Sequence, residues 1–178
     1  MLTFHRLDRF EPSLSKLLQE LRLQDDSPDT SDVLDLVAEA KKRACPKGVS
    51  RVGHIEARNR NTITVNGVDL KSRGLRVNTD HTMRVFAFAA TSGTELAAWA
   101  NGLEDPVLHF YALSITEYAL NSMVELMEQD LHKKFKTGPL ARMLPGSLQD
   151  WPIHEQGNIF HLLGQARRTS GFGSHRQN

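Results

Sequence analysis

Residues 139–164 read PLARMLPGSLQDWPIHEQGNIFHLLG, and this stretch predicts an extended segment, a tight turn and a helix. Pro145 and Gly146 set the turn, because proline fixes φ and glycine accepts a positive φ. Pro152 suits the first turn of the helix, where its missing N–H costs nothing. Four apolar residues give that helix one apolar side, namely Ile153, Ile159, Phe160 and Leu163.

Arg142 stands just before this turn and is the first candidate for ligand binding. An arginine beside an exposed turn backbone suits a carboxylate or a phosphate, because its planar fork can bind two oxygens at once. Taken singly, however, Arg142 is better explained by a surface ion pair, and Pro145-Gly146 by an ordinary surface turn. The wider pattern of the stretch must therefore carry any functional interpretation.

Composition excludes several classes of protein. The 178 residues fit one domain with a sizeable core, and a net charge of +1 creates no strong field toward nucleic acid. The single cysteine, Cys45, excludes an internal disulfide framework and suits a reducing cytosol. No 18-residue apolar run, signal peptide or His-x-x-x-His pair is found, so we expect a cytoplasmic protein without membrane, nucleic-acid or metal partners.

Two helices are predicted in the first third of the chain. The first carries Leu14, Leu17, Leu18 and Leu21 on one face, and the second carries Val33, Leu36, Val37 and Ala40. The second helix can be capped by Asp29, Thr30, Ser31 or Asp32. It is expected to end at Cys45-Pro46, because a proline disfavours helix for the residue before it.

The middle of the chain predicts a sheet. Residues 62–65 and 68–70 flank Asn66-Gly67, which is the strongest short hairpin signal. Residues 75–77 and 83–90 also have strand character, and residues 84–90 are apolar enough for a central strand covered on both faces. Thr94 is then predicted to cap a helix over residues 95–100.

A long helix from Asp105-Pro106 to about Phe135 supplies the second candidate for ligand binding. Glu117 falls on an apolar stripe of this helix, between Leu113 and Leu120. A carboxylate facing the core needs a partner, because burying it unpaired is costly. That partner is either an internal arginine or backbone donor, or the ammonium or ribose of a bound ligand. Helices, then a hairpin-rich sheet, then helices predict an α+β fold.

Residues 139–164 also carry a family resemblance. Arg-x-x-Pro-Gly at 142–146, Asp-Trp-Pro-Ile-x-Glu-Gln at 150–156 and Ile-Phe-x-Leu-Leu at 159–163 resemble the signature of the methionine synthase activation domain. The resemblance is strongest to short, free-standing proteins similar to that domain. It implies a curved, mostly antiparallel sheet with flanking helices and a ligand in the concave face.

The resemblance also implies an S-adenosylmethionine site. Arg142 would clamp the methionine carboxylate, and the backbone at Leu144 and Gly146 would contact the adenosine. Ser147 stands where the family has tyrosine, which removes an aromatic wall. Glu117 matches a ligand-contacting glutamate on the helix before the arginine motif. No catalytic residue and no metal ligand is implied.

The implied function is reactivation of a cobalamin-dependent methyltransferase. A cob(II)alamin carried by a partner, such as a methionine synthase, receives one electron from a flavodoxin-like or ferredoxin-like donor. The reduced cobalt then takes the methyl group of S-adenosylmethionine. The alternative is a non-catalytic interaction module that docks on a corrinoid protein without binding S-adenosylmethionine. The replacement at Ser147 favours this second interpretation, and Arg142 favours the first.

Residues 1–164 are expected to form one activation-domain-like unit. Residues 165–178 are rich in glycine, serine and arginine, and are expected to be a disordered or truncated tail. Relatives continue at this point with a strand that completes the ligand pocket. The resemblance therefore implies a pocket that lacks one wall.

Overall fold

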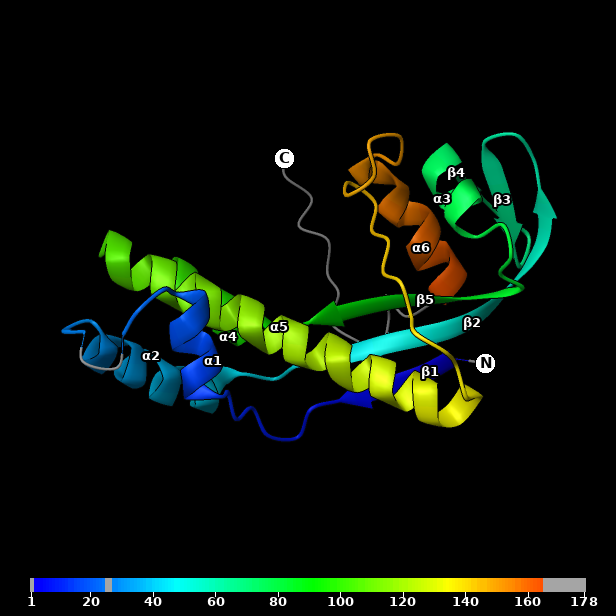
Figure 1. The fold of residues 1–178 in the computed structure, drawn as a ribbon. Helices are drawn as coiled ribbons and strands as arrows, with labels where there is room; N and C mark the ends of the chain where they lie inside the picture. The colour runs from blue at the N-terminus through cyan, green and yellow to red at the C-terminus, as the bar shows by residue number, and fades with distance from the viewer. Residues whose placement is uncertain (1, 25–26, 165–178) are drawn as a thin grey trace. The chain divides into compact units, whose positions relative to one another are not determined.

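The computed structural model describes residues 2–24 and 27–164, and Figure 1 shows their path. Contacts divide the chain into two compact units. The sheet unit contains the N-terminal residues up to Thr3, the segment Val49–Ala89 and the segment from Gly138. The helical unit contains Phe4–Gly48 and Ala90–Thr137. One domain over residues 1–164 stays a prediction, and the predicted tail at 165–178 lies outside the described residues.

Five strands form one sheet: β1 (Leu2–Arg6), β2 (Lys47–Arg58), β3 (Thr62–Val65), β4 (Val68–Lys71) and β5 (Arg84–Thr91). Their order is β1-β2-β3-β4, with β5 also paired to β2. Among the described residues, β2 pairs with three other strands and β5 pairs only with β2, which contradicts the prediction of residues 84–90 as the central strand of that part of the sheet. Only Ala87 of β5 is buried, so this strand is not covered on both faces.

The predicted hairpin is confirmed. Strands β3 and β4 are antiparallel, and Val65 lies opposite Val68 across the two-residue turn. Asn66 and Gly67 both have positive φ, at 45° and 76°. This conformation matches the right-handed twist of the flanking strands, which is why Asn-Gly favours it. Strand β2 pairs antiparallel with β3, with an irregularity between Ile55 and Ala57.

Residues 75–77 form no strand, contrary to prediction, because they lie inside the short helix α3 (Arg73–Asn78). The Ser72 hydroxyl accepts a hydrogen bond from the Leu75 amide at 3.0 Å and so caps the first turn. Leu75 is the buried residue of this helix, which packs beside β3. Leu75 and Val77, two apolar residues on either side of Arg76 that suit a strand, thus lie inside one short helix.

The core of the sheet unit receives residues from the strands, from α3 and from the end of the described chain. A short 3-10 helix, η1 (Ile153–Glu155), follows Pro152 and leads into α6 (Gln156–Leu163). Helix α6 packs beside β4, as Figure 1 shows. The helix predicted here is confirmed, although Ile153 is 65% exposed. The buried core comprises Val49, Ile55, Ile63, Val65, Leu70, Leu75, Ala87, Trp151, Leu162 and Leu163.

The helical unit contains α1 (Leu14–Glu20), α2 (Thr30–Arg43), α4 (Thr94–Asn101) and α5 (Pro106–Phe135). Helices α2 and α4 pack against α5 and against each other (Figure 1). The predicted long helix is confirmed, and the Asp105 carboxylate accepts from the Val107 and Leu108 amides at 2.8 and 3.0 Å. The two predicted N-terminal helices are also present.

The start of α4 differs from prediction. Thr94 is already helical, and the capping position belongs to Gly93, whose φ is 110°. A Cβ on Gly93 would stand 3.1 Å from the Cys45 amide nitrogen. The close approach of these two segments therefore requires glycine at the capping position.

Candidate functional site

The predicted ligand turn is built by reciprocal hydrogen bonds between Leu144 and Ser147. The Ser147 amide donates to the Leu144 carbonyl at 3.0 Å, and the Ser147 hydroxyl donates to the same oxygen at 2.7 Å. The Leu144 amide donates back to the Ser147 hydroxyl at 3.1 Å. Gly146 between them has a φ of 93°, and its amide donates to the Trp151 carbonyl at 2.6 Å. Glycine is favoured here because other residues rarely adopt such a φ.

Asp150 ties the end of this turn to α3. Its carboxylate accepts from the Ser72 hydroxyl at 2.9 Å, from the Gly74 amide at 3.2 Å and from the Arg73 amide. Desolvation of the carboxyl opposes its ionisation, but these hydrogen bonds outweigh that effect and lower the pKa of Asp150. Asp150 is therefore a positioning residue that the sequence analysis did not identify. The Asp-Trp-Pro signal was noted without a role for the aspartate.

Trp151 holds the same segment to the core. Its side chain is 2% exposed and belongs to the buried cluster of the sheet unit. Its backbone forms an isolated bridge with Leu148, and the Trp151 amide donates to the Leu148 carbonyl at 3.1 Å. The turn before Trp151 is thus fastened on one side by an aromatic side chain and on the other by the Asp150 carboxylate.

The face of the turn offers a charge and apolar groups to solvent. Arg142 is exposed, Leu144 is 49% exposed and Ile153 is 65% exposed. A Cβ at Gly146 would lie 3.5 Å from the Ile153 side chain, so Ile153 packs directly against the turn. An arginine and apolar residues exposed on one short segment suit a molecule that combines a carboxylate with an apolar or aromatic part.

Glu117 belongs to the helical unit, whereas Arg142, Leu144, Gly146 and Ser147 belong to the sheet unit. The premise that Glu117 faces the core was wrong, because Glu117 is exposed. The buried stripe of α5 runs instead through Tyr111, Ala112, Ile115, Ala119, Met123, Val124, Met127 and Leu131. A role for Glu117 in ligand binding stays a prediction that no longer depends on burial.

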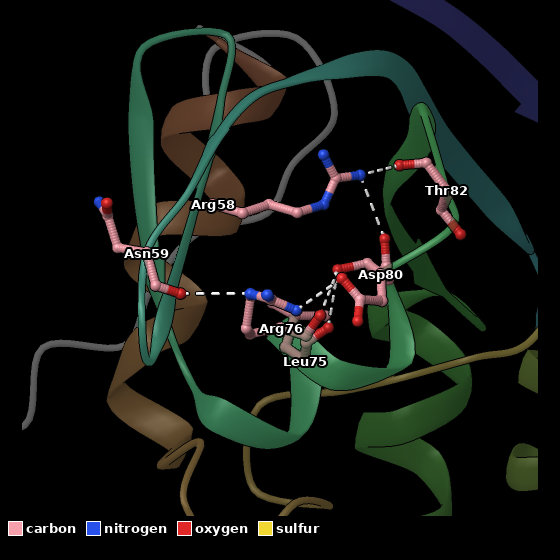
Figure 2. Close-up of polar contacts among 7 residues, drawn as sticks. Arg58, Asn59, Leu75, Arg76, Asp80 and Thr82 are labelled. Carbon is pink, nitrogen blue, oxygen red and sulfur yellow. Dashed lines mark hydrogen bonds and ion pairs between the residues drawn. The ribbon is translucent and has the colours of Figure 1, made fainter.

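A second cluster of charge surrounds the end of α3, as Figure 2 shows. Arg58 donates from Nη2 to the backbone carbonyls of Thr79, at 3.2 Å, and Thr82. Arg76 donates to the Asn59 carbonyl at 3.2 Å and pairs with Asp80 at 2.8 Å. Arg58 Nε is buried and has no hydrogen-bond partner among the described residues. Arg58 bonds to the carbonyl at the C-cap of α3 and to one in the loop that follows, and Arg76 bonds to the carbonyl that follows β2, so we assign both arginines a structural role.

The described part of the chain has neither a cluster of metal-ligating side chains nor a helix suited to span a membrane. Within residues 2–24 and 27–164, no group of three or more histidine, cysteine, aspartate or glutamate side chains is placed to hold a metal ion. Over the same residues, no helix combines the length and apolar character needed to span a membrane.

Comparison with known proteins shows which fold these elements form. No protein-family profile matches the chain, and no curated protein matches it in sequence. Among solved structures, the chain is similar to a crystal structure of the MetH reactivation domain bound to AdoHcy, with a TM-score of 0.59 and 14% sequence identity. The match covers 92% of this chain and 70% of the other. The chain therefore has the fold of the MetH reactivation domain, an α+β fold with a curled, mostly antiparallel sheet and flanking helices.

Proposed function

We propose that the chain binds S-adenosylmethionine and supports the reductive remethylation of cob(II)alamin on a partner methyltransferase. The observation that carries this proposal is the shared fold with a reactivation domain that binds AdoHcy, over 92% of the chain. The construction of the turn at residues 144–147 supports it, because this turn is held by the buried Trp151 and by the Asp150 carboxylate, and an exposed arginine, Arg142, precedes it. A fold by itself hosts many functions, so the site residues must carry the chemistry.

S-adenosylmethionine fits the groups on the turn. Its carboxylate suits the Arg142 guanidinium, which can form two parallel hydrogen bonds with it. Its adenine suits the exposed apolar groups of Leu144 and Ile153. A contact of its ammonium with Glu117 follows from the family resemblance alone, and the geometry of the turn gives it no support. These residues bind and orient the methyl donor, and no acid or base from the chain is required.

Cobalamin and the electron come from partners in this proposal. The chain contains no Asp-x-His-x-x-Gly motif, so a corrinoid methyltransferase module would carry the cobalamin. That cobalamin, once reduced, supplies the nucleophile for the methyl group. A flavodoxin-like or ferredoxin-like protein would donate the electron. The task of this chain is to hold the sulfonium in position for transfer.

Calorimetry with S-adenosylmethionine tests the proposal on the full chain, on Arg142→Ala and on the matched control Arg60→Ala. Arg60 is exposed in the connection between β2 and β3, away from the turn in sequence. We expect binding in the wild type and the control, and at least a tenfold loss in Arg142→Ala. Ligand at a hundredfold excess over Kd should stabilise the native state by about 2.7 kcal/mol. No binding by a wild type that melts cooperatively would refute the proposal.

The second candidate function is a non-catalytic module that docks on a corrinoid protein. Ser147 favours it, because the aromatic wall of the family is absent and the serine hydroxyl bonds to the Leu144 backbone instead. A cooperative melt without S-adenosylmethionine binding, together with co-elution with a cobalamin-loaded methyltransferase module, would support this alternative. Binding of S-adenosylmethionine would refute it.

A further inference from the structure

The Ser147 side chain forms hydrogen bonds with the backbone of Leu144, a residue assigned to the proposed ligand site. The Leu144 amide has one hydrogen, which it donates to the Ser147 hydroxyl at 3.1 Å. The Leu144 carbonyl has two lone pairs, and it accepts from the Ser147 hydroxyl at 2.7 Å and from the Ser147 amide at 3.0 Å. The backbone of Leu144 thus has its full complement of hydrogen bonds within the turn.

The same contacts show what chemistry these groups would recognise. One hydroxyl oxygen reaches both the amide and the carbonyl of Leu144, so the two groups converge on one place. A hydroxyl is a donor and an acceptor side by side. The edge of an adenine ring has the same pattern, with an amino donor beside a ring-nitrogen acceptor. In this chain the Ser147 hydroxyl takes the hydrogen bonds of the Leu144 amide and carbonyl that an adenine edge could otherwise form.

The Ser147 bonds can be exchanged more easily than the other bonds of the turn. Ser147 is exposed, and both of its hydroxyl bonds lie in an exposed environment. The Gly146 amide, by contrast, is bonded to the carbonyl of the buried Trp151. Rotation of the Ser147 side chain alone would free the Leu144 amide and one lone pair, without opening the turn.

We propose that Ser147 is a specificity-determining residue whose hydroxyl competes with the adenine edge for the backbone of Leu144. This inference rests on the proposed function, because it assigns a role within that site. The competition weakens adenosyl ligands relative to a turn without the hydroxyl. An exposed hydrogen bond has a modest net value, so its removal should tighten binding about threefold to tenfold.

Two measurements on the full chain test the competition. Calorimetry compares S-adenosylmethionine binding by the wild type, by Ser147→Ala and by Ser147→Thr, which keeps the hydroxyl. Amide hydrogen exchange at Leu144, followed by NMR without ligand, compares the same three proteins. We expect Ser147→Ala to bind about threefold to tenfold more tightly and to exchange faster at Leu144, while Ser147→Thr resembles the wild type in both measurements.

The outcomes separate the inference from the proposed function. Equal or weaker binding by a folded Ser147→Ala, with the wild type still binding, would overturn the competition and leave the proposed function intact. Unchanged exchange at Leu144 in Ser147→Ala would overturn the role of the hydroxyl in the turn. Absence of binding in all three folded proteins would overturn the proposed function and the competition together.

Discussion

Replacing Trp151 tests how the candidate turn is fastened to the sheet unit. The indole is 2% exposed, but its Nε1 is buried without a hydrogen-bond partner among the described residues. Burial of the ring stabilises the fold, and burial of the unpaired N–H opposes it. The two effects can be separated, because phenylalanine keeps an aromatic ring and lacks the N–H.

The structure sets the size of each effect. A buried aromatic side chain removes about 150–250 Å² from water, which contributes about 4–6 kcal/mol. An unpaired buried N–H costs about 1–3 kcal/mol. Trp151→Ala should therefore lower the free energy of unfolding by about 3 kcal/mol. Trp151→Phe loses part of the ring but also the unpaired group, so it should stay within about 1 kcal/mol of the wild type.

Urea unfolding followed by far-UV circular dichroism measures both variants against the wild type. For a chain of this length, about 3 kcal/mol corresponds to a melting temperature lower by about 6–12 °C. A loss for Trp151→Phe as large as that for Trp151→Ala would refute the reasoning, because the N–H would then have to be stabilising. Trp99 is the other tryptophan and lies in the helical unit, so its fluorescence in Trp151→Phe reports that unit separately.

Four other substitutions have defined outcomes. Asp150→Asn should destabilise the fold at neutral pH. Because folding lowers the pKa of Asp150 from 3.8, the ionised carboxylate stabilises the fold above the unfolded-state pKa, and this stabilisation is lost as the pH falls through the folded-state pKa. The melting temperatures of the variant and the wild type should therefore converge in acid. Arg58→Met removes the donor to two carbonyls at the end of α3 and should cost about 2 kcal/mol in urea unfolding; no loss would contradict the capping role. Gly93→Ala should lower the free energy of unfolding by about 1–3 kcal/mol, because Gly93 has a positive φ and a new Cβ would meet Cys45. Gly157 lies in open space within α6, so Gly157→Ala should raise the free energy of unfolding by about 0.5 kcal/mol. Equal melting temperatures for the two variants would refute the strain argument.

Several elements follow from local sequence, because their signals act over a few residues. Asn66-Gly67 favours a positive φ at two successive positions, and the flanking β-branched residues pair across it. Asp105-Pro106 starts α5 with a side-chain cap and a proline that needs no hydrogen-bonded amide. The turn at Pro145-Gly146 and the helix after Pro152 follow from local signals of the same kind.

The candidate site was predictable only in part. The motif placed Leu144, Gly146 and Ser147 on one turn and Arg142 just before it, since these residues are close in sequence. The periodicity of α5 placed Glu117 on the wrong face, because the apolar residues Leu113 and Leu120 suggest a buried face but are not in the buried stripe. A helix with apolar residues on several sides does not reveal which of them meets the core until its neighbours α2 and α4 are known.

The sequence by itself determined the hairpin, the long helix, the α+β class and the turn that carries the candidate ligand groups. Only the tertiary structure decided that residues 73–78 are a helix. That segment has strand character, but Asp150 reaches its first amides from 76 positions away or more, and Arg58 reaches the carbonyls that follow its last turn. A six-residue helix has too few internal hydrogen bonds to be stable alone. Asp150, distant in the sequence, accepts from the free N-terminal amides of this helix, and Arg58 holds the loop that follows it, so no local pattern predicts these partners.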